Sequence, residues 1–335
     1  IDSGLLARQR DVDDARCAEK PVTPIVAENC RQGSPPQEWD VNAAGEAAIQ
    51  GFAVPFSVSP GTQVDFKVKA ESRAFSVDVY RAGYYGGLGA RKIVTLEARH
   101  GSQPPCQLYD DTLLVDCSNW DVSASWHIPP DAVSGVYFAR LTLTDDLGNW
   151  RVDGSGTTSS PKFRNPDWNQ SLQPPCGSRE ECPAMAHAYG SLKLRGGADK
   201  LLHTSLQKPY ASHAYFVVRA PAHEKHDVLF QTSDTTWQAY NTYIAPSTYG
   251  VQPLPRHNFS IPSWEGRRAY KKSYNAPIVT RDTRSVNMLF GPEISAIRFL
   301  EANGYDVSYW SGYDTHRFGA ELADRAKVIH SFSRS

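Results

Sequence analysis

The stretch DVLFQTSDTTWQAYNTYIAPSTYG, residues 227–250, decides how the second half of the chain folds. Val228–Phe230 is a short apolar run of strand-forming residues, and polar residues typical of turns follow it directly. This pattern predicts a buried strand that delivers a loop. The predicted loop is rich in aromatic and hydrogen-bonding side chains, namely Thr235, Thr236, Trp237, Gln238, Tyr240, Asn241, Tyr243, Ser247 and Tyr249.

The position of this loop after a strand predicts a binding site. In an open α/β sheet, ligands bind at the carboxyl ends of the strands. We therefore take Trp237, Gln238 and Asn241 as candidate ligand-binding residues. A second interpretation stays open, because tyrosine and tryptophan side chains are often packed in the protein interior. In that case the loop is an aromatic corner of the core.

The residues that follow predict an α/β domain over 220–335. Pro292 opens a helix with apolar residues at helical spacing, and Asn303–Gly304 ends it. The other predicted elements are a strand at Val307–Trp310, a short helix at Ala320–Ala326 and a strand at Lys327–Phe332. This alternation indicates right-handed crossovers and a parallel sheet. Three such strands form half of a doubly wound, flavodoxin- or amidotransferase-like domain. We therefore expect a second chain, cut from the same precursor, to complete it; the alternative is a truncated form.

The residues upstream predict a different architecture. Over 42–150 the pattern is β throughout; Val64, Phe66 and Val68, for example, alternate with polar residues. We interpret this region as an antiparallel, Ig-like β-sandwich. An irregular, proline-rich strap at 1–41 precedes it, and a long irregular insertion at 151–219 follows it. The predicted fold class is α+β, with a β-sandwich followed by an incomplete doubly wound parallel domain.

The cysteines predict the redox setting. Six cysteines form three local pairs: Cys17/Cys30, Cys106/Cys117 and Cys176/Cys182. Fifteen connectivities are possible, and sequential pairing is the simplest because each pair brackets a turn-rich segment. The first residue is not methionine, and Asn169 and Asn258 are glycosylation acceptors. Together these features favour a secreted, extracellular protein.

The charge balance excludes two classes of partner. The 335 residues include 35 Lys+Arg and 36 Asp+Glu, which leaves no net field to attract nucleic acid or an anionic membrane. No apolar run approaches the ~20 residues of a membrane-spanning helix. We therefore predict neither a nucleic acid nor a membrane partner.

A glycine-rich run, YRAGYYGGLGAR at Tyr80–Arg91, lies within the predicted sandwich. A phosphate-binding loop requires a strand-to-helix transition, and here another strand follows the run. We expect instead a wide hairpin with positive-φ glycines. Its tyrosines and arginines are predicted to pack against the neighbouring domain.

Several motifs taken together resemble the N,N-dimethylformamidase large-subunit family. PIVAEN (24–29), the glycine-rich run and SGVYFARL (134–141) are similar to the β-sandwich of that family. FVVR (216–219), DTTWQAYN (234–241) and FLEANGYDVSYWSGYDTH (299–316) are similar to the start of its catalytic domain. The family continues after the third strand with a Gly-His-Asp-Glu-Tyr-Trp segment that this sequence lacks.

This resemblance implies a metal-dependent hydrolase that acts on the C–N bond of an amide. The implied cofactor is iron held by two tyrosines and a glutamate, which are hard ligands suited to ferric iron. Tyr240 is the first candidate ligand, and Tyr274 or Tyr249 is the second. The glutamate is expected on the companion chain; Glu265 and Glu293 are nearby substitutes outside the matching motifs.

Two further hypotheses come from the residues alone. Asp314 and His316 follow the second strand and form a candidate acid–base pair, although Asp314 equally suits a helix cap. The sequence has no G-x-S-x-G or H-E-x-x-H motif. The alternative function is a non-catalytic, lectin-like secreted protein that binds a glycan or another protein. The expected ligand is thus a small amide or a glycan.

Overall fold

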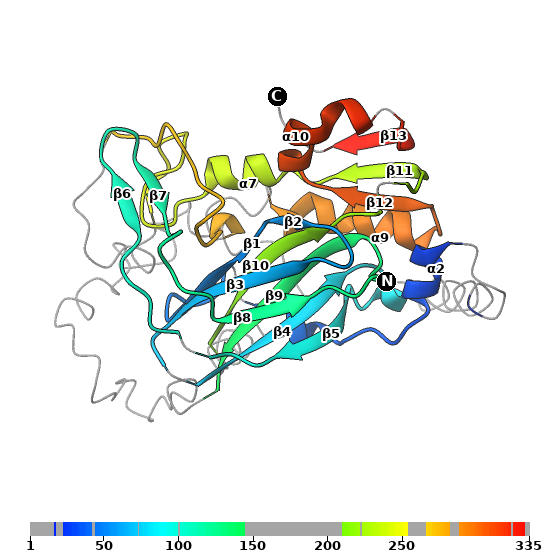
Figure 1. Ribbon diagram of the computed structural model, residues 1–335, viewed down its shortest axis with the longest axis horizontal. Helices are drawn as coiled ribbons and strands as arrows, with labels where there is room; N and C mark the ends of the chain where they lie inside the picture. The colour runs from blue at the N-terminus through cyan, green and yellow to red at the C-terminus, as the bar shows by residue number, and fades with distance from the viewer. Residues whose placement is uncertain are drawn as a thin grey trace, which may run out of the picture. The chain divides into compact units, whose positions relative to one another are not determined.

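Two β-sheets packed face to face make up the first part of the fold (Figure 1). The computed structural model describes residues 17, 23–41, 44–72, 74–99, 101–144, 210–221, 223–253, 266–281, 288–322 and 324–331. The chain divides into two compact units, one of Ile1–Asp145 with Tyr210–Ser335 and the other of Asp146–Pro209. Every described residue belongs to the first unit.

One sheet has the order β1-β3-β8, with β1 at Ile49–Val54, β3 at Gln63–Ala70 and β8 at Ala124–His127. The other has the order β2-β10-β9-β4-β5, with β2 at Ser57–Val58, β10 at Ala211–Val218, β9 at Gly135–Leu143, β4 at Phe75–Ala82 and β5 at Ala90–Leu96. Val64, Phe66 and Val68 have no exposed surface and face the core between the sheets. The predicted alternation is therefore confirmed.

Strand β10 corrects one boundary of the prediction. Residues 151–219 were expected to be irregular, yet β10 pairs antiparallel with β9 and parallel with β2. All eight of its residues are buried. Phe216 packs in the core between the sheets, and Tyr215 packs on the opposite face against the α/β layer. Because both faces are covered, the alternation that normally marks a strand is absent. Asn169, Cys176, Cys182 and Asn258 lie outside the described residues.

The second part of the fold is a parallel sheet of order β12-β11-β13, with β11 at His226–Gln231, β12 at Val307–Trp310 and β13 at Ala326–Ser331. Helix α9 (Ile294–Ala302) connects β11 to β12, and α10 (Gly312–Leu322) connects β12 to β13. These strands and α9 agree with the prediction, and Gly304, at φ 72°, follows α9 as expected. Helix α10 begins eight residues earlier than the predicted Ala320. The described chain is α+β.

The stretch after β11 is a helix rather than the predicted loop. Helix α7 spans Asp234–Tyr240 and begins two residues after Thr232 (Figure 1). Trp237 has no exposed surface, and its backbone amide donates to the Ser233 carbonyl at 3.0 Å. Burial of Trp237 stabilises a short helix that local preference alone does not specify.

A second core joins the sandwich to the α/β layer. The side chains from the sandwich include Val136, Phe138, Tyr215 and Val217, and those from the α/β layer include Phe230, Trp237, Ile297, Val307 and Tyr309. Sheet β2-β10-β9-β4-β5 is therefore covered on both faces. The sandwich thus supports α7 and the ends of the parallel strands.

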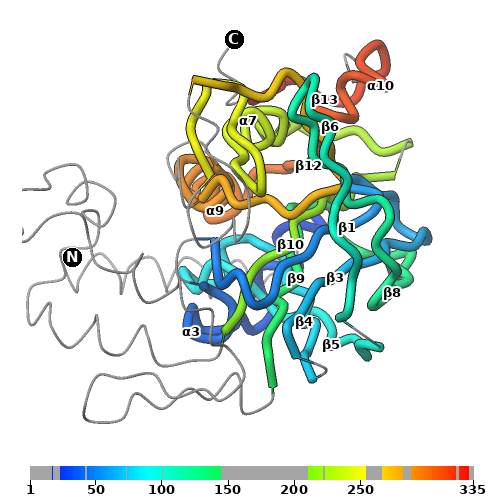
Figure 2. The backbone as a smooth tube through the Cα atoms, turned by 90° about the vertical axis from the view of Figure 1, so that its left-hand side faces the viewer, coloured from blue at the N-terminus to red at the C-terminus, as the bar shows by residue number. Residues whose placement is uncertain are grey.

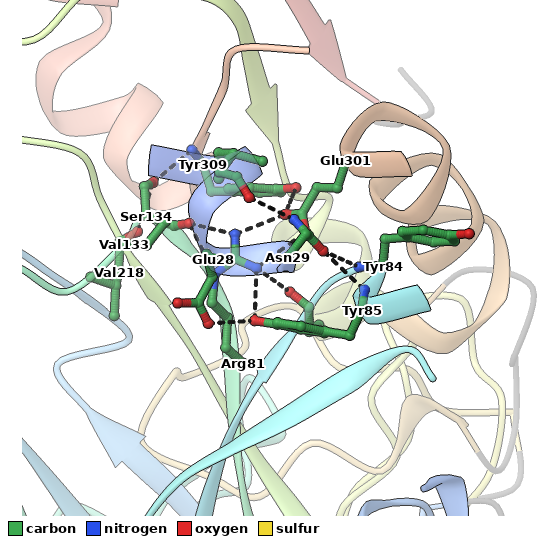
Figure 3. A network of polar contacts seen from close by, with 12 residues as sticks. Glu28, Asn29, Arg81, Tyr84, Tyr85, Val133, Ser134, Val218, Glu301 and Tyr309 are labelled. Atoms are coloured by element: carbon green, nitrogen blue, oxygen red, sulfur yellow. Dashed lines mark hydrogen bonds and ion pairs between the residues drawn. The ribbon is translucent and has the colours of Figure 1, made fainter. Parts of the chain in front are cut away.

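A buried ion pair reinforces this junction (Figure 3). Arg81 on β4 and Glu301 on α9 have fully buried side chains and approach to 2.7 Å. Tyr309 donates to the same carboxylate at 2.7 Å, and Asn29 donates at 2.9 Å. Arg81 also donates to the Tyr85 hydroxyl at 3.1 Å. The glycine-rich run is thus the predicted hairpin, and Arg81 and the Gly87 carbonyl contact α9 of the neighbouring layer.

The turn of this hairpin is η1 (Tyr85–Gly87), where Gly86, Gly87 and Gly89 have φ of 63°, 93° and 86°. The remaining elements are α2 (Pro24–Asn29), α3 (Pro36–Trp39), the hairpin β6 (Gln107–Tyr109) and β7 (Leu114–Asp116), and the short turn η5 (Leu289–Glu293).

Cys17–Cys30 and Cys106–Cys117 form disulfides, as the sequential pairing predicts. Among the described residues, no helix has the length and apolar character needed to span a membrane.

Candidate functional site

Polar side chains gather where β11 and β12 end, beside the start of α9. Asp234 follows β11, Asp314 follows β12, and Glu293 immediately precedes α9. None of the three carboxyl groups has exposed surface. Because the carboxyl ends of parallel strands meet at one edge of the sheet, this edge is the expected position for a site.

Asp234 connects the ends of both strands. Its carboxylate accepts hydrogen bonds from the Thr232 hydroxyl at 2.7 Å and the Gly312 amide at 2.6 Å. It also accepts one from the Tyr274 hydroxyl at 2.5 Å. Burial raises the pKa of Asp234 above its ordinary value, although these hydrogen bonds act in the opposite direction.

Tyr274 is the partly exposed member of this network. Its ring lies 5.1 Å from that of Phe56 and 5.5 Å from that of Tyr313. Burial, and then the negative charge of Asp234, raise the pKa of Tyr274 far above that of an ordinary phenol. Tyr274 is therefore a protonated hydrogen-bond donor whose carboxylate partner lies beneath it.

Glu293 anchors α7 to the start of α9. Its carboxylate accepts from the Trp237 indole at 2.7 Å and from both the hydroxyl and the amide of Ser233. Burial raises the pKa of Glu293 to about 7, although these donors favour the ionised form. A carboxyl group with this pKa changes charge close to neutral pH.

Asp314 caps the start of helix α10. Its carboxylate accepts from the Ser311 amide at 3.0 Å, and the Ser311 hydroxyl accepts from the Asp314 amide at 3.0 Å. This reciprocal pair is a capping box, and it explains why α10 starts at Gly312. Arg219 donates to the other carboxylate oxygen at 2.8 Å. His316 is exposed and lies two residues along the same helix, where side chains do not face each other. The structure thus shows the capping role and does not bring the predicted acid–base pair together.

The candidate ligand-binding residues lie in the interior. Trp237 has no exposed surface, and Gln238 and Asn241 are 4% and 3% exposed. Asn241 donates to the Pro277 carbonyl at 2.9 Å and accepts from the Val279 amide at 3.0 Å. These contacts fix the backbone around α7. In this conformation the three side chains form the aromatic corner of the core that the sequence left open as an alternative.

The other tyrosine candidates lie at the far end of α7. Tyr240 ends the helix, and its ring stacks on that of Tyr249 at 4.6 Å between centroids. Asp234, which holds Tyr274, begins the helix, so the two ends are separated by six residues, or about 9 Å along its axis. Tyr249 is 64% exposed.

The described tyrosines do not present the implied iron ligand set. The hydroxyl of Tyr274 is bound to Asp234, and its raised pKa opposes the phenolate that ferric iron requires. Within the described ranges, no group of three or more His, Cys, Asp or Glu side chains is arranged to hold a metal ion. Iron therefore stays a prediction from the resemblance.

Sequence patterns did not single out two basic residues near this edge, the half-buried Lys272 and the buried His213. Lys272 donates to the carbonyls of Asn241 and Pro246, both at 2.7 Å, and burial lowers its pKa to about 8. His213 on β10 contacts the Trp39 carbonyl at 2.7 Å, and burial lowers its pKa to about 3. His213 also lines a cavity of about 10 Å³, which is close to the size of one water molecule. Neither the basic stretch that contains Lys272 nor the strand that contains His213 has a sequence pattern that predicts these contacts.

The comparisons with known proteins place the chain in a family. The family model described as N,N-dimethylformamidase beta subunit-like, C-terminal, matches residues 76–333. This match spans both the sandwich and the α/β layer, so the chain belongs to that family, as the motifs indicated. No curated protein matches the chain.

One similar solved structure is a cellulose-active polysaccharide monooxygenase from M. thermophila. It is 19% identical, and the match covers 31% of this chain and 55% of that chain at a TM-score of 0.15. The match thus spans little more than half of the monooxygenase chain. A likeness of this size carries no argument about fold or activity.

Proposed function

We propose that this chain is part of a secreted hydrolase that acts on the C–N bond of an amide. The observation that supports this proposal is the family match over residues 76–333, which runs through both layers and includes Asp234 and Tyr274. The two disulfides Cys17–Cys30 and Cys106–Cys117 are consistent with an oxidising compartment. Glycosylation at Asn169 and Asn258 stays a prediction.

Amide hydrolysis needs a group that moves protons beside the substrate. Tyr274 is suited to this role because its hydroxyl is partly exposed and is hydrogen bonded to a buried carboxylate. Because the raised pKa of Tyr274 opposes a free phenolate, its proton passes to Asp234 only as Tyr274 Oη takes a proton from water or substrate, in one concerted relay. The raised pKa of Asp234 favours this transfer, because it makes the aspartate a stronger base than an exposed one. Gly312 and Thr232 hold Asp234 in place during the transfer.

We further propose that a companion chain completes the α/β layer and, with it, the site. Strand β13 has β11 on one side, and among the described residues no strand pairs with its other side. Val328 and Ile329 are 56% and 48% exposed, although successive strand residues point to opposite faces. Parallel sheets are normally covered on both faces. In this arrangement the companion contributes the remaining part of the doubly wound domain and the glutamate implied by the resemblance.

Amine release tests the proposed activity. The natural particle, with any companion chain, is incubated with formamide, N,N-dimethylformamide and a set of acetamides, and the released ammonia or amine is measured. Tyr274→Phe and Asp234→Asn are expected to lower kcat about 100-fold or more, which is typical of a lost acid–base group. Tyr305→Phe, a change at an exposed tyrosine after α9, is the matched control. Amine release that is absent in every case, or unchanged in Tyr274→Phe, contradicts the proposal.

Metal analysis of the same preparations tests the iron implied by the resemblance. About one iron per particle, with loss of that iron in Tyr240→Phe or Tyr249→Phe, would support a tyrosine-ligated site. If Tyr240→Phe, Tyr249→Phe and Tyr274→Phe all leave the iron content unchanged, these three residues are not iron ligands.

A further inference from the structure

We propose that an exposed tyrosine surface next to the site binds a neutral oligosaccharide by stacking on its sugar rings. This surface consists of Tyr109, Tyr249, Tyr270 and Arg268. The three tyrosines are 46%, 64% and 67% exposed and belong to the exposed large hydrophobic side chains of the described residues. The proposal does not depend on amide hydrolysis.

Three segments that are distant in sequence lie side by side and carry these residues (Figures 1 and 2). The Ala269 amide donates to the Ser247 carbonyl at 3.0 Å, which joins the Tyr270 segment to the Tyr249 segment. The Tyr270 amide donates to the Thr112 carbonyl at 2.8 Å, in the turn of the β6–β7 hairpin that also carries Tyr109. Backbone hydrogen bonds therefore join the three segments that carry the tyrosines.

Neighbouring side chains hold two of the rings in place. Tyr249 stacks on Tyr240 at 4.6 Å between centroids, with an angle of 25° between the rings. The Arg268 guanidinium lies over the Tyr270 ring at 5.3 Å from its centroid. Each ring has a neighbour on one face, and its exposure leaves the other face open to solvent. Rings that are fixed before binding lose little side-chain freedom when a ligand stacks on them.

The composition of this surface favours a neutral sugar over other ligands. Among the described residues, the exposed charged side chains in these segments are three cations and two anions: Arg267, Arg268, Lys271, Asp110 and Asp111. This near balance gives little attraction for a polyanion. The exposed aliphatic residues Val328 and Ile329 lie on β13, away from these segments. Phenol rings offer an apolar face for the C–H side of a pyranose, and phenol and guanidinium groups can bond its hydroxyls.

Binding of defined oligosaccharides tests this proposal. The full chain is titrated by calorimetry with the hexamers of β-1,4-glucose, β-1,4-N-acetylglucosamine and α-1,6-mannose, and with heparin as a polyanion. We expect at least one neutral hexamer to bind with its affinity nearly unchanged between 50 mM and 500 mM salt. Tyr270→Ala and Tyr109→Ala are each expected to weaken binding about tenfold, whereas Tyr270→Phe, which keeps the ring, changes it less than about threefold.

The matched control is Tyr305→Ala, because Tyr305 is 46% exposed like Tyr109 but follows α9. It is expected to bind the hexamer as the unchanged chain does. Thermal unfolding of each variant establishes that it folds, and Tyr270→Phe keeps the test valid if an alanine variant does not. The proposal is overturned if no neutral hexamer binds at millimolar concentration, if heparin alone binds, or if Tyr305→Ala weakens binding as much as Tyr270→Ala.

Discussion

The Arg81 side chain is permanently charged and has no exposed surface. The ion pair with Glu301 compensates this buried charge. Removing one partner of a buried ion pair leaves the other charge without compensation. We therefore expect Arg81→Met to lower the free energy of unfolding by about 3–5 kcal/mol. Guanidinium chloride denaturation, followed by tryptophan fluorescence, measures this change.

A matched variant separates burial from charge pairing as the cause. Lys92 forms an ion pair of the same length, 2.7 Å, with Asp78, but its side chain is 39% exposed. Lys92→Met is therefore expected to cost less than about 1 kcal/mol. The double variant Arg81→Met with Glu301→Gln should lose less unfolding free energy than Arg81→Met alone, because neither charge of the buried pair is left. Equal losses in Arg81→Met and Lys92→Met would contradict this account.

Glu293 predicts how stability depends on pH. Burial raises its pKa from 4.5 to about 7, so the folded state binds the proton more tightly than the unfolded chain does. This contribution is fully present below pH 4.5 and is lost as pH rises through about 7. Its full size is about 3 kcal/mol. The free energy of unfolding should therefore fall as pH rises from 4.5 to 7.5. Glu293→Gln cannot titrate, so this slope of the unfolding free energy against pH should be absent from the variant.

The control for this pH dependence is a glutamate on the surface. Glu321 on α10 has a 58% exposed side chain and forms an ion pair with Arg325 at 2.9 Å. Glu321→Gln should keep the slope of the unchanged chain. A Glu293→Gln variant with that same slope would assign the pH dependence to other groups.

At the scale of elements, the hairpin of β6 and β7 depends on its disulfide. Cys106–Cys117 closes this hairpin with a sequence separation of 11 residues. Replacing both cysteines with alanine is expected to lower the free energy of unfolding by about 2–4 kcal/mol. Because Tyr109 ends β6, the same variant should weaken hexasaccharide binding.

The other described disulfide is the control for this prediction. Cys17–Cys30 tethers the residue that follows α2, which carries none of the tyrosine surface. The variant without Cys17 and Cys30 should therefore bind the hexasaccharide as before. Chemical denaturation and calorimetry on the two double variants decide between a local and a general effect of losing a disulfide.

Elements with a clean apolar period were predictable from sequence, and elements fixed by distant contacts were not. Helix α9 and strand β3 each bury one face, so Ile297 and Phe66 fall on a recognisable period. Strand β10 buries both faces and has no such period. Helix α7 depends on Trp237, whose indole donates to Glu293, 56 residues further along the chain.

The same distinction applies to the candidate site. Its position at the carboxyl ends of the strands followed from the order of strands and helices. The pairing of Asp234 with Tyr274 did not, because 40 residues separate them and the segment between them is irregular in pattern. An aspartate at the start of a helix is usually only a cap, so no pattern singles out Asp234 as a functional residue.

At the scale of the whole molecule, the two layers depend on each other. The core between them includes Phe138 and Tyr215 from the sandwich and Phe230 and Tyr309 from the parallel sheet. Arg219, which follows β10, donates to Asp314 in the first turn of α10, and Ser57 on β2 donates to the same carboxylate. The sandwich therefore supports the geometry of the candidate site in addition to covering the sheet.

The outer side of β13 predicts the composition of the natural particle. Native mass spectrometry of that particle should give a mass above that of one chain, because the proposed companion would cover Val328 and Ile329. The double variant Val328→Asp with Ile329→Asp places charge on both faces of this edge and should lose the companion. Val122→Asp, at a 39% exposed valine outside β13, should retain it. A natural particle with the mass of a single chain, or a companion that the double variant retains, would contradict the proposed completion of the sheet.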